Sequence, residues 1–504
     1  MVLEGSTQKK TGAIISYVTL VAQTLSTILV TPFFIRSLGK GEYGLFELVG
    51  STVSYLSILG LGLASAYIRF YSKYDREKEQ DKIASLNGLF LSVYSLMSLV
   101  CLVIGALLIL NIRWIFGSGI EPNDFGRAQI IMVILVIDMA LKFPGSIFIS
   151  YTSAHERFIF QRTLTLIETI LIPVLRILFV VRGYQSIGLA AAALCASLFE
   201  LTINGIYNFR KLDIKFSFKS LDKGLFGEIA VFTAFLFINQ LYDILGGSKV
   251  DIFIIGRIRG TEEVTVYSVA DKFVRIFYSV ANPIAAVFVP QVNRLVAIGN
   301  KLKDINRIFI RVSKIQFMIQ MLILSGFCLF GQKFIKIWMG EGFEVSYWIA
   351  FIIMAADIVA LSQHIGIEIQ RAMNKHKIRS VVLLFTNLGN IALTIPLTMK
   401  LGALGAAIGT AGCEIIGTVM FMNWYYKVHL ELDVKEYWRQ ILKIILYVVP
   451  LTGIFFYVNS AYAADSNVKT LILVFVYVAV YSFGLFCISL NGEERRNILK
   501  NFES

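Results

Sequence analysis

Residues 84–110 read ASLNGLFLSVYSLMSLVCLVIGALLIL, an uninterrupted run without a charged side chain. A helix of this length rises about 40 Å, which exceeds the roughly 30 Å hydrocarbon thickness of a bilayer. Within the hydrocarbon a lone segment satisfies its backbone polar groups only as a helix, because no water is there to bond them. The run therefore predicts a transmembrane helix.

Runs of the same kind fill most of the chain. We count about fourteen that are long enough to cross a bilayer as helices, at 14–35, 44–66, 84–110, 128–150, 163–181, 187–208, 225–248, 264–289, 315–332, 345–368, 380–399, 402–425, 441–458 and 468–490. The longest polar interval, 291–314, is too short for a folded domain, and we interpret it as a loop. The membrane-embedded part must therefore carry the function.

Composition and charge agree with this class. The chain is 56% hydrophobic and 16% charged, and its mean hydropathy of +0.70 is typical of a polytopic membrane protein. A net charge of +13 can indicate nucleic acid, but the basic residues gather in alternate loops. The positive-inside rule then predicts that both termini and these loops are cytoplasmic, with anionic lipid rather than nucleic acid as the counterpart of the charge. The clusters lie at 69–82, 210–223, 294–314 and 371–379.

The chain also partly repeats itself. LGKGEYGLF at 38–46 resembles GRIRGTEEVTVY at 256–267, and GLAAA at 188–192 resembles GAAIG at 405–409. Both pairs are offset by about 220 residues, which accommodates six helices and their loops. An even number of helices gives both halves the same orientation in the membrane. The alternative is that glycine-rich helix starts recur by chance.

The repeat predicts an all-α fold with two six-helix lobes and an added helix pair. The expected limits are 1–211 for the N-terminal lobe, 212–427 for the C-terminal lobe and 428–504 for the pair and tail. The two lobes are expected to be related by pseudo-two-fold symmetry.

Four segments carry a resemblance to a known family. TPFFIRSLGKGEYG at 31–44, followed by YLSILGLG at 55–62, resembles the opening of the Wzx-type oligosaccharide flippases of the multidrug/oligosaccharidyl-lipid/polysaccharide export superfamily. DIFIIGR at 251–257 and AMNKH at 372–376 are further matches. The resemblance implies a carrier in the bacterial inner membrane that moves an undecaprenyl-diphosphate-linked oligosaccharide to the outer leaflet by alternating access. It also implies a monomer, with a polysaccharide polymerase and glycosyltransferases as possible partners.

Such a carrier needs a wet cavity with cations for the diphosphate, because charge and hydroxyls lose their water in hydrocarbon. Lys272 and Arg275 are three residues apart and share a helix face, whereas Asp271 is expected to point elsewhere, so Arg275 is the strongest candidate ligand. Alternatively, Lys272 snorkels to the interface. Asp138 and Lys142 are spaced to pair with each other. The candidate substrate-binding residues are Arg275, Lys272, Lys142, Arg176 and Lys249.

A cation site is the second prediction. Asp243 precedes a Gly-Gly-Ser bend, Asn387 and Asn390 share a helix face, and Glu414 lies in the next span. In some relatives a sodium ion is bound among the corresponding helices, and hard oxygen donors suit such a cation. Asp243, Asn387, Asn390 and Glu414 are therefore a candidate sodium or proton site. Interhelical hydrogen bonding is the alternative role.

Three other function classes are compatible with a polytopic membrane protein. A cation-coupled drug or small-metabolite antiporter of the same superfamily stays open, although cationic drugs favour an acidic cavity over Lys142, Lys272 and Arg275. A membrane-embedded glycosyltransferase or polymerase needs a large outward loop, and the outward gaps are short. An ATP-driven pump needs the phosphate-cradling G-x-x-x-x-G-K-[ST] motif, which the sequence lacks. We therefore predict a transporter without enzymatic activity or cofactor, apart from coupling to Na⁺ or H⁺.

Overall fold

A computed structural model describes residues 5–60, 62–218, 227–228, 248–299, 302–375, 377–462 and 466–488. Every element in these ranges is a helix, which confirms the predicted all-α class. Twelve of the described helices are long and apolar enough to cross a membrane. A helix covers each predicted span except 225–248, which lies almost wholly outside the described residues.

The first of the twelve covers two predicted spans at once. It runs from Thr11 to Arg76, a length of 66 residues. Its main part, α1 (Gly5–Ser54), bends at Gly39, where φ is 83° and ψ is 166°. Only a glycine adopts this backbone conformation without strain. The bend falls between the spans predicted at 14–35 and 44–66, and the total of fourteen spans stays a prediction.

The interval 291–314 is not the loop that the sequence predicts. Helix α10 (Thr261–Ile298) continues through its first part and α11 (Leu302–Met339) begins soon after. Ile305, Ile308 and Val312 are buried, whereas Arg307 and Arg311 on other faces are exposed. This spacing makes an amphipathic helix, whose charged face lowers the mean hydropathy without ending the helix.

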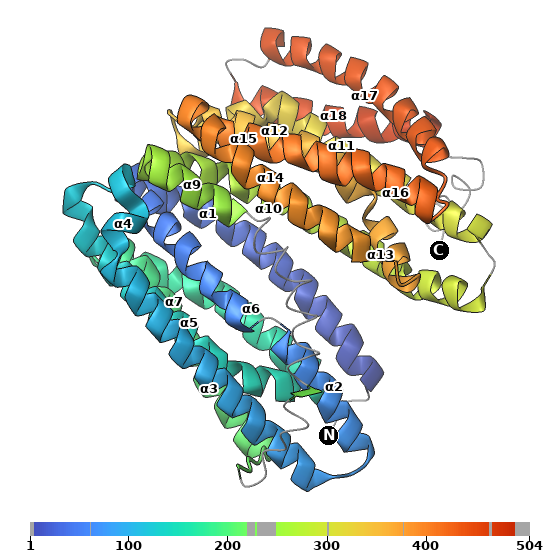
Figure 1. The fold of residues 1–504 in the computed structure, drawn as a ribbon. Helices are drawn as coiled ribbons and strands as arrows, with labels where there is room; N and C mark the ends of the chain where they lie inside the picture. Colours follow the sequence, from blue (N-terminus) through green and yellow to red (C-terminus); the bar gives the residue numbers. More distant parts are fainter. Residues whose placement is uncertain are drawn as a thin grey trace. The chain divides into compact units, whose positions relative to one another are not determined.

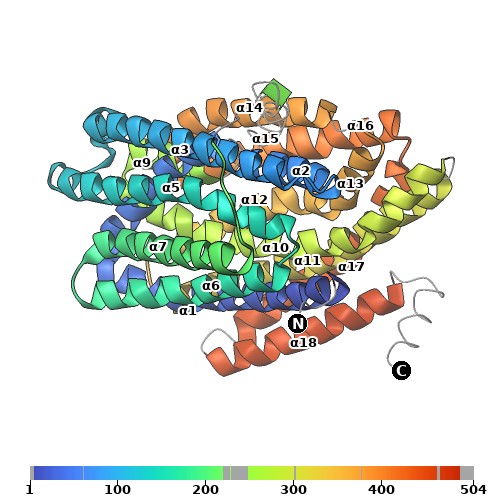
Figure 2. The same ribbon diagram turned by 90° about the horizontal axis from the view of Figure 1, so that it is seen from below.

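The described chain divides into two compact units, Met1–Ser268 and Val269–Ser504. Besides α1, the helices of the first unit are α2 (Leu63–Arg76), α3 (Gln80–Leu110), α4 (Ile112–Phe116), α5 (Phe125–Ala154), α6 (Phe158–Val181), α7 (Gln185–Lys211), α9 (Ser248–Arg259) and the first turns of α10. In this unit α3 packs on α5, α5 on α7, α7 on α6 and α6 on α1, an order that Figure 2 shows from one side of the unit to the other.

Besides most of α10 and the whole of α11, the second unit holds α12 (Glu344–Ser362), α13 (His364–Ala372), α14 (Lys377–Leu401), α15 (Ala403–Glu414), α16 (Met422–His429), α17 (Val434–Tyr462) and α18 (Asn467–Ile488). In this unit α14 packs on α15, α15 on α12, α12 on α11, and α11 on both α17 and α18 (Figure 1). α17 and α18 also pack on each other. A π-helical stretch, Ile415–Phe421, joins α15 to α16. The predicted lobe limits and their pseudo-two-fold relation stay predictions.

Candidate functional site

Charged side chains at membrane depth meet within the first unit. Lys142 Nζ lies 2.7 Å from Asp138 Oδ2 on α5, so the predicted pairing of these two residues is confirmed. Asp138 is buried, whereas the Lys142 side chain is 46% exposed. An ion pair of this kind lowers the cost of placing both charges in a membrane helix.

Arg176 on α6 joins this group from a neighbouring helix. Its guanidinium carbon lies 5.2 Å from the centre of the Phe46 ring, within the range of a cation–π interaction. Tyr43, Glu47 and Asp138 are its electrostatic neighbours, and Tyr43 donates a 2.9 Å hydrogen bond to Glu47. The buried Nε of Arg176 has no hydrogen-bond partner among the described residues.

Two further carboxyl groups complete the cluster. Glu168 on α6 and Glu200 on α7 are electrostatic neighbours of each other and of Lys142. The cluster thus combines two cations with four acidic side chains, Glu47, Asp138, Glu168 and Glu200. The sequence predicts that each of these charged residues lies within a membrane span. Only the packing of α1, α5, α6 and α7 shows that they lie close together.

In the second unit, Arg275 does not stand apart from acidic residues as the sequence reasoning expects. Its Nε lies 2.6 Å from Asp271 Oδ2. Asp271 and Arg275 are four residues apart on α10 and therefore share a face. The expectation was wrong because it considered only the adjacent pair Asp271 and Lys272. The Arg275 side chain remains 54% exposed, so the pair orients the guanidinium without enclosing it.

A second group of acids lies close to this pair. Tyr278 on α10 donates a hydrogen bond to Asp357 on α12, and Asp357 is 4% exposed. Glu414 on α15 is an electrostatic neighbour of both. The π-helical stretch begins directly after Glu414, and such stretches are frequent at functional sites. No signal in the sequence places Tyr278 and Asp357 together.

The predicted cation site is only partly within the described residues. Asp243 lies outside them. Asn387 and Asn390 are buried on α14, and Asn390 Oδ1 accepts hydrogen bonds from Thr394, at 2.8 Å, and from Thr410 on α15, at 3.2 Å. Asn390 therefore makes the interhelical hydrogen bond of the alternative interpretation. Across the described ranges, no three His, Cys, Asp or Glu side chains are grouped closely enough to hold a metal ion.

The predicted substrate-binding cations divide between the units. Lys142 and Arg176 belong to the acidic cluster of the first unit. Lys249 is half-buried in the first turn of α9 in the same unit. Lys272, also half-buried, and Arg275 lie on α10 in the second unit.

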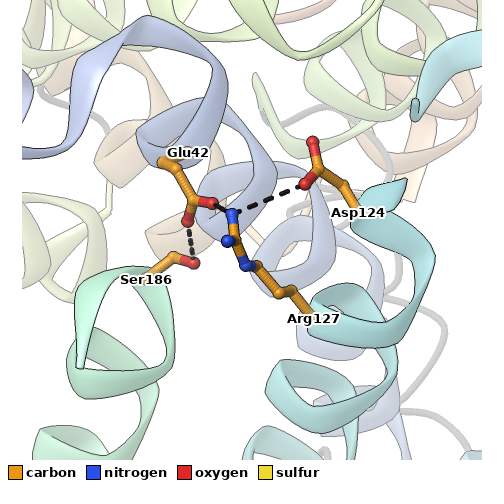
Figure 3. A network of polar contacts seen from close by, with 4 residues as sticks. All are labelled: Glu42, Asp124, Arg127 and Ser186. Atoms are coloured by element: carbon orange, nitrogen blue, oxygen red, sulfur yellow. Dashed lines mark hydrogen bonds and ion pairs between the residues drawn. The ribbon is translucent and has the colours of Figure 1, made fainter. Parts of the chain in front are cut away.

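A polar network joins three helices of the first unit near the bend of α1 (Figure 3). The Arg127 guanidinium lies between Glu42 and Asp124, pairing with both, and its nitrogen is 3.5 Å from the Asp124 carboxylate. Ser186, at the start of α7, donates to Glu42. The network thus fixes α5 and α7 to α1 at one end of the unit.

The two segments of the first sequence repeat touch each other at the same end. Thr265 Oγ1 donates a 2.6 Å hydrogen bond to Lys40 O. A Cβ atom on Gly44 would lie 2.6 Å from the carbonyl carbon of Thr261 and 2.7 Å from Thr265 Oγ1, so only glycine permits this approach. We call the contact of residues 40–48 with residues 256–268 the outward corner, after the predicted orientation.

An all-helical polytopic fold with charged clusters at membrane depth defines the class of polytopic membrane transporters. Residues 9–296, more than half of the chain, match the model of a family described as polysaccharide biosynthesis protein. The chain belongs to this polysaccharide biosynthesis protein family.

Known proteins agree with this assignment. The chain is 22% identical over 498 residues to the uncharacterized membrane protein EpsK of Bacillus subtilis (strain 168), covering 94% of each chain. It is 22% identical over 405 residues to a putative O-antigen transporter of Shigella flexneri, covering 80% of this chain and 94% of that protein. These matches and the family model confirm the resemblance read from residues 31–44.

Solved structures show the same fold. The lipid II flippase MurJ in an inward closed conformation superposes with a TM-score of 0.74 at 17% identity, covering 94% of this chain and 97% of that chain. An inward-facing multidrug resistance transporter of the MATE family gives a TM-score of 0.57 at 15% identity, covering 84% and 96%. At these identities the likeness establishes the helical architecture only.

Proposed function

We propose that the protein is a flippase that moves an undecaprenyl-diphosphate-linked oligosaccharide from the cytoplasmic to the outer leaflet by alternating access, for surface polysaccharide synthesis. The observation that carries the proposal is membership of the polysaccharide biosynthesis family over residues 9–296. Similarity to a putative O-antigen transporter supports the same class of cargo. The protein would lie in the bacterial cytoplasmic membrane with both termini in the cytoplasm, and would perform no chemical step on the glycan.

The proposed diphosphate ligands are Arg275 and Lys272, on one face of α10. Guanidinium groups bind phosphate oxygens through paired, charge-assisted hydrogen bonds. Asp271 bonds the Nε atom and so fixes the direction in which the guanidinium points, while the side chain stays half exposed. Lys142, Arg176 and Lys249 are proposed to contact the diphosphate at other stages of transport.

Ion coupling is proposed to use the buried acids of the second unit. Asp357 and Glu414 are electrostatic neighbours on different helices, so protonation or cation binding there would relieve the repulsion between α12 and α15. Asp243, Asn387 and Asn390 would complete the site as predicted from the sequence. A cation moves a conformational equilibrium only if it binds the two states unequally.

A gene deletion tests the proposed cargo. We expect lipid-linked repeat units to accumulate on the cytoplasmic leaflet and the surface glycan to disappear, while synthesis of the repeat unit continues. Loss of repeat-unit assembly would instead indicate an enzyme.

Substitution of Arg275 tests the proposed ligand. Arg275→Ala should abolish export at near-normal membrane abundance, and Arg275→Lys should retain part of it because lysine keeps the charge and loses the fork. Arg307→Ala, on the exposed face of α11, is the matched control and should export normally. Full export by Arg275→Ala would remove this residue from the site.

The second candidate function is a cation-coupled antiporter for a drug or small metabolite. The acidic excess of the first-unit cluster favours it, since four carboxyl groups surround only Lys142 and Arg176. A deletion strain with normal surface glycan and altered drug resistance would support this function over the flippase.

A further inference from the structure

A cavity of about 840 Å³ lies in the second unit where α11 ends, α12 begins and α17 ends. Its wall combines the cations Lys333 and Lys336 with the acid Glu344, the amide Asn459 and aromatic rings that include Tyr347 and Trp348. The cavity is separate from the charged residues discussed above, none of which lines it.

Hydrogen bonds between helices hold the wall in place. Tyr347 donates a 3.0 Å bond to Cys328 O, and Asn459 Nδ2 donates a 3.2 Å bond to Leu329 O. These bonds fix the start of α12 and the end of α17 to the same turns of α11. The cavity is therefore built by tertiary structure and does not depend on a single loop.

The two lysines have different surroundings. Lys333 Nζ donates to Thr470 Oγ1 at 2.8 Å and to Ser466 O at 3.3 Å, so it links α11 to the start of α18. Lys336 lies 3.5 Å from Glu341, with side chains 65% and 84% exposed. Such an exposed pair is weak and exchanges readily for another anion.

Exposed aromatic residues line the cavity and lie close to it. Trp348 is 50% exposed and Phe456 is 60% exposed, and both line the cavity. The Trp338 and Phe334 rings stack nearby on α11, with centroids 5.9 Å apart. Exposed aromatic rings at the ends of transmembrane helices are typical of the membrane–water interface.

One face of α17 continues from the cavity toward the membrane centre. Ser460, Phe456, Gly453 and Val449 follow one another at helical spacings of four, three and four residues. A Cβ on Gly453 would meet no atom within 4 Å, so this face is open beside the glycine. A hydrocarbon chain lying along this face would begin at the cavity. A free anion has no such chain, so the open face favours a lipid as the ligand.

We propose that the cavity binds the phosphate head group of a membrane lipid, with Lys336 and Lys333 as its cations and the exposed face of α17 along its chain. In the predicted orientation this lipid lies in the outer leaflet. The lipid would brace α17 against α11 and α12, because residues of these three helices line the cavity. The source is either a bilayer phospholipid or a polyprenyl phosphate, which share this head-group chemistry.

The test measures lipid binding to the purified full-length protein by native mass spectrometry and by thermal stabilisation. Phosphatidylglycerol should bind saturably, and Lys336→Glu should weaken its affinity about tenfold through loss of a charge-assisted contact. Ser460→Trp fills the cavity without changing its charge and should have a similar effect. Lys435→Ala with Lys443→Ala, both exposed on the other half of α17, is the matched control and should bind as the wild type.

Competition identifies the source of the head group. Displacement of phosphatidylglycerol by sub-stoichiometric undecaprenyl phosphate supports the lipid carrier, whereas no displacement supports a bilayer phospholipid. Equal binding by wild type, Lys336→Glu and Ser460→Trp, or equal stabilisation by inorganic phosphate alone, would overturn the proposal. Because the assay involves no transport, its failure is distinct from failure of the flippase function.

Discussion

The close approach at Gly44 leads to a quantitative prediction. Adding one methyl group, as Gly44→Ala, places a carbon atom 2.6 Å from the carbonyl carbon of Thr261, where ordinary contacts begin at 3.4 Å. The Thr261 carbonyl oxygen would be closer still, so the two backbones of the outward corner must then separate by more than about 0.8 Å. Overpacking of this kind costs about 1–3 kcal/mol. If α1 and α10 part at this corner during transport, a cost of about 2 kcal/mol raises the open population roughly thirtyfold.

Cysteine labelling measures this population. Ser268 is 1% exposed and lies three residues after Thr265, on the same side of α10. In a cysteine-free version carrying Ser268→Cys, an impermeant thiol reagent added from outside should react roughly thirtyfold faster when Gly44→Ala is also present. Gly41→Ala is the matched control, because its Cβ would lie 3.8 Å from its nearest neighbour, Thr261 Oγ1.

Two results would contradict an opening of the outward corner during transport. Equal labelling rates in Gly44→Ala and Gly41→Ala, with both proteins folded at wild-type thermal stability, would show that the corner does not open during transport. A large loss of thermal stability in Gly44→Ala alone would show that the contact maintains the fold and does not act as a gate.

Three further predictions concern topology, pH and ions. Single cysteines at positions 262 and 300 should differ in labelling from outside, with only 262 reacting; the reverse result would overturn the predicted orientation. Burial lowers the pKa of His155 below its usual value, so the unfolded state binds a proton more readily than the folded state. The contribution of His155 to the free energy of unfolding should therefore be full above about pH 6.5 and decrease below it. The decrease should be at most about 1.4 kcal/mol per pH unit. His155→Gln should flatten this part of the thermal-denaturation profile, and an unchanged profile would assign the loss to another group. Sodium or pH should shift the labelling of the outward corner, and Asp243→Asn should reduce that shift; identical behaviour in sodium and potassium at every pH would leave the acids with a structural role.

Local patterns in the sequence predict the features that depend on neighbouring residues. The length of each apolar run predicts its helix, because a membrane span must satisfy its backbone within itself. The pair Asp138–Lys142 follows in the same way from a spacing of four residues. The pair Asp271–Arg275 has the same spacing, and the sequence reasoning missed it by comparing Asp271 only with the adjacent Lys272.

Local sequence patterns do not predict the features that depend on packing between helices. Tyr278, Asp357 and Glu414 lie far apart in the chain and meet only because α10, α12 and α15 are packed in one unit. The same is true of Arg176 and Phe46. The interval 291–314 shows a different limit, since hydropathy averages over an amphipathic helix and hides the buried side formed by Ile305 and Val312.

The lengths of α10 and α11 have a practical consequence for imaging this protein. Each helix has 38 residues and is therefore about 57 Å long, roughly 25 Å more than the hydrocarbon requires. Asn306 bonds to Glu431 O and to the Asp433 N–H, so the projecting start of α11 is tied to the turn before α17. A helical marker protein fused directly to the start of α11 would thus inherit the orientation of the second unit. It would give electron microscopy a rigid feature outside the micelle for aligning particles of a protein whose mass otherwise lies almost entirely within the membrane.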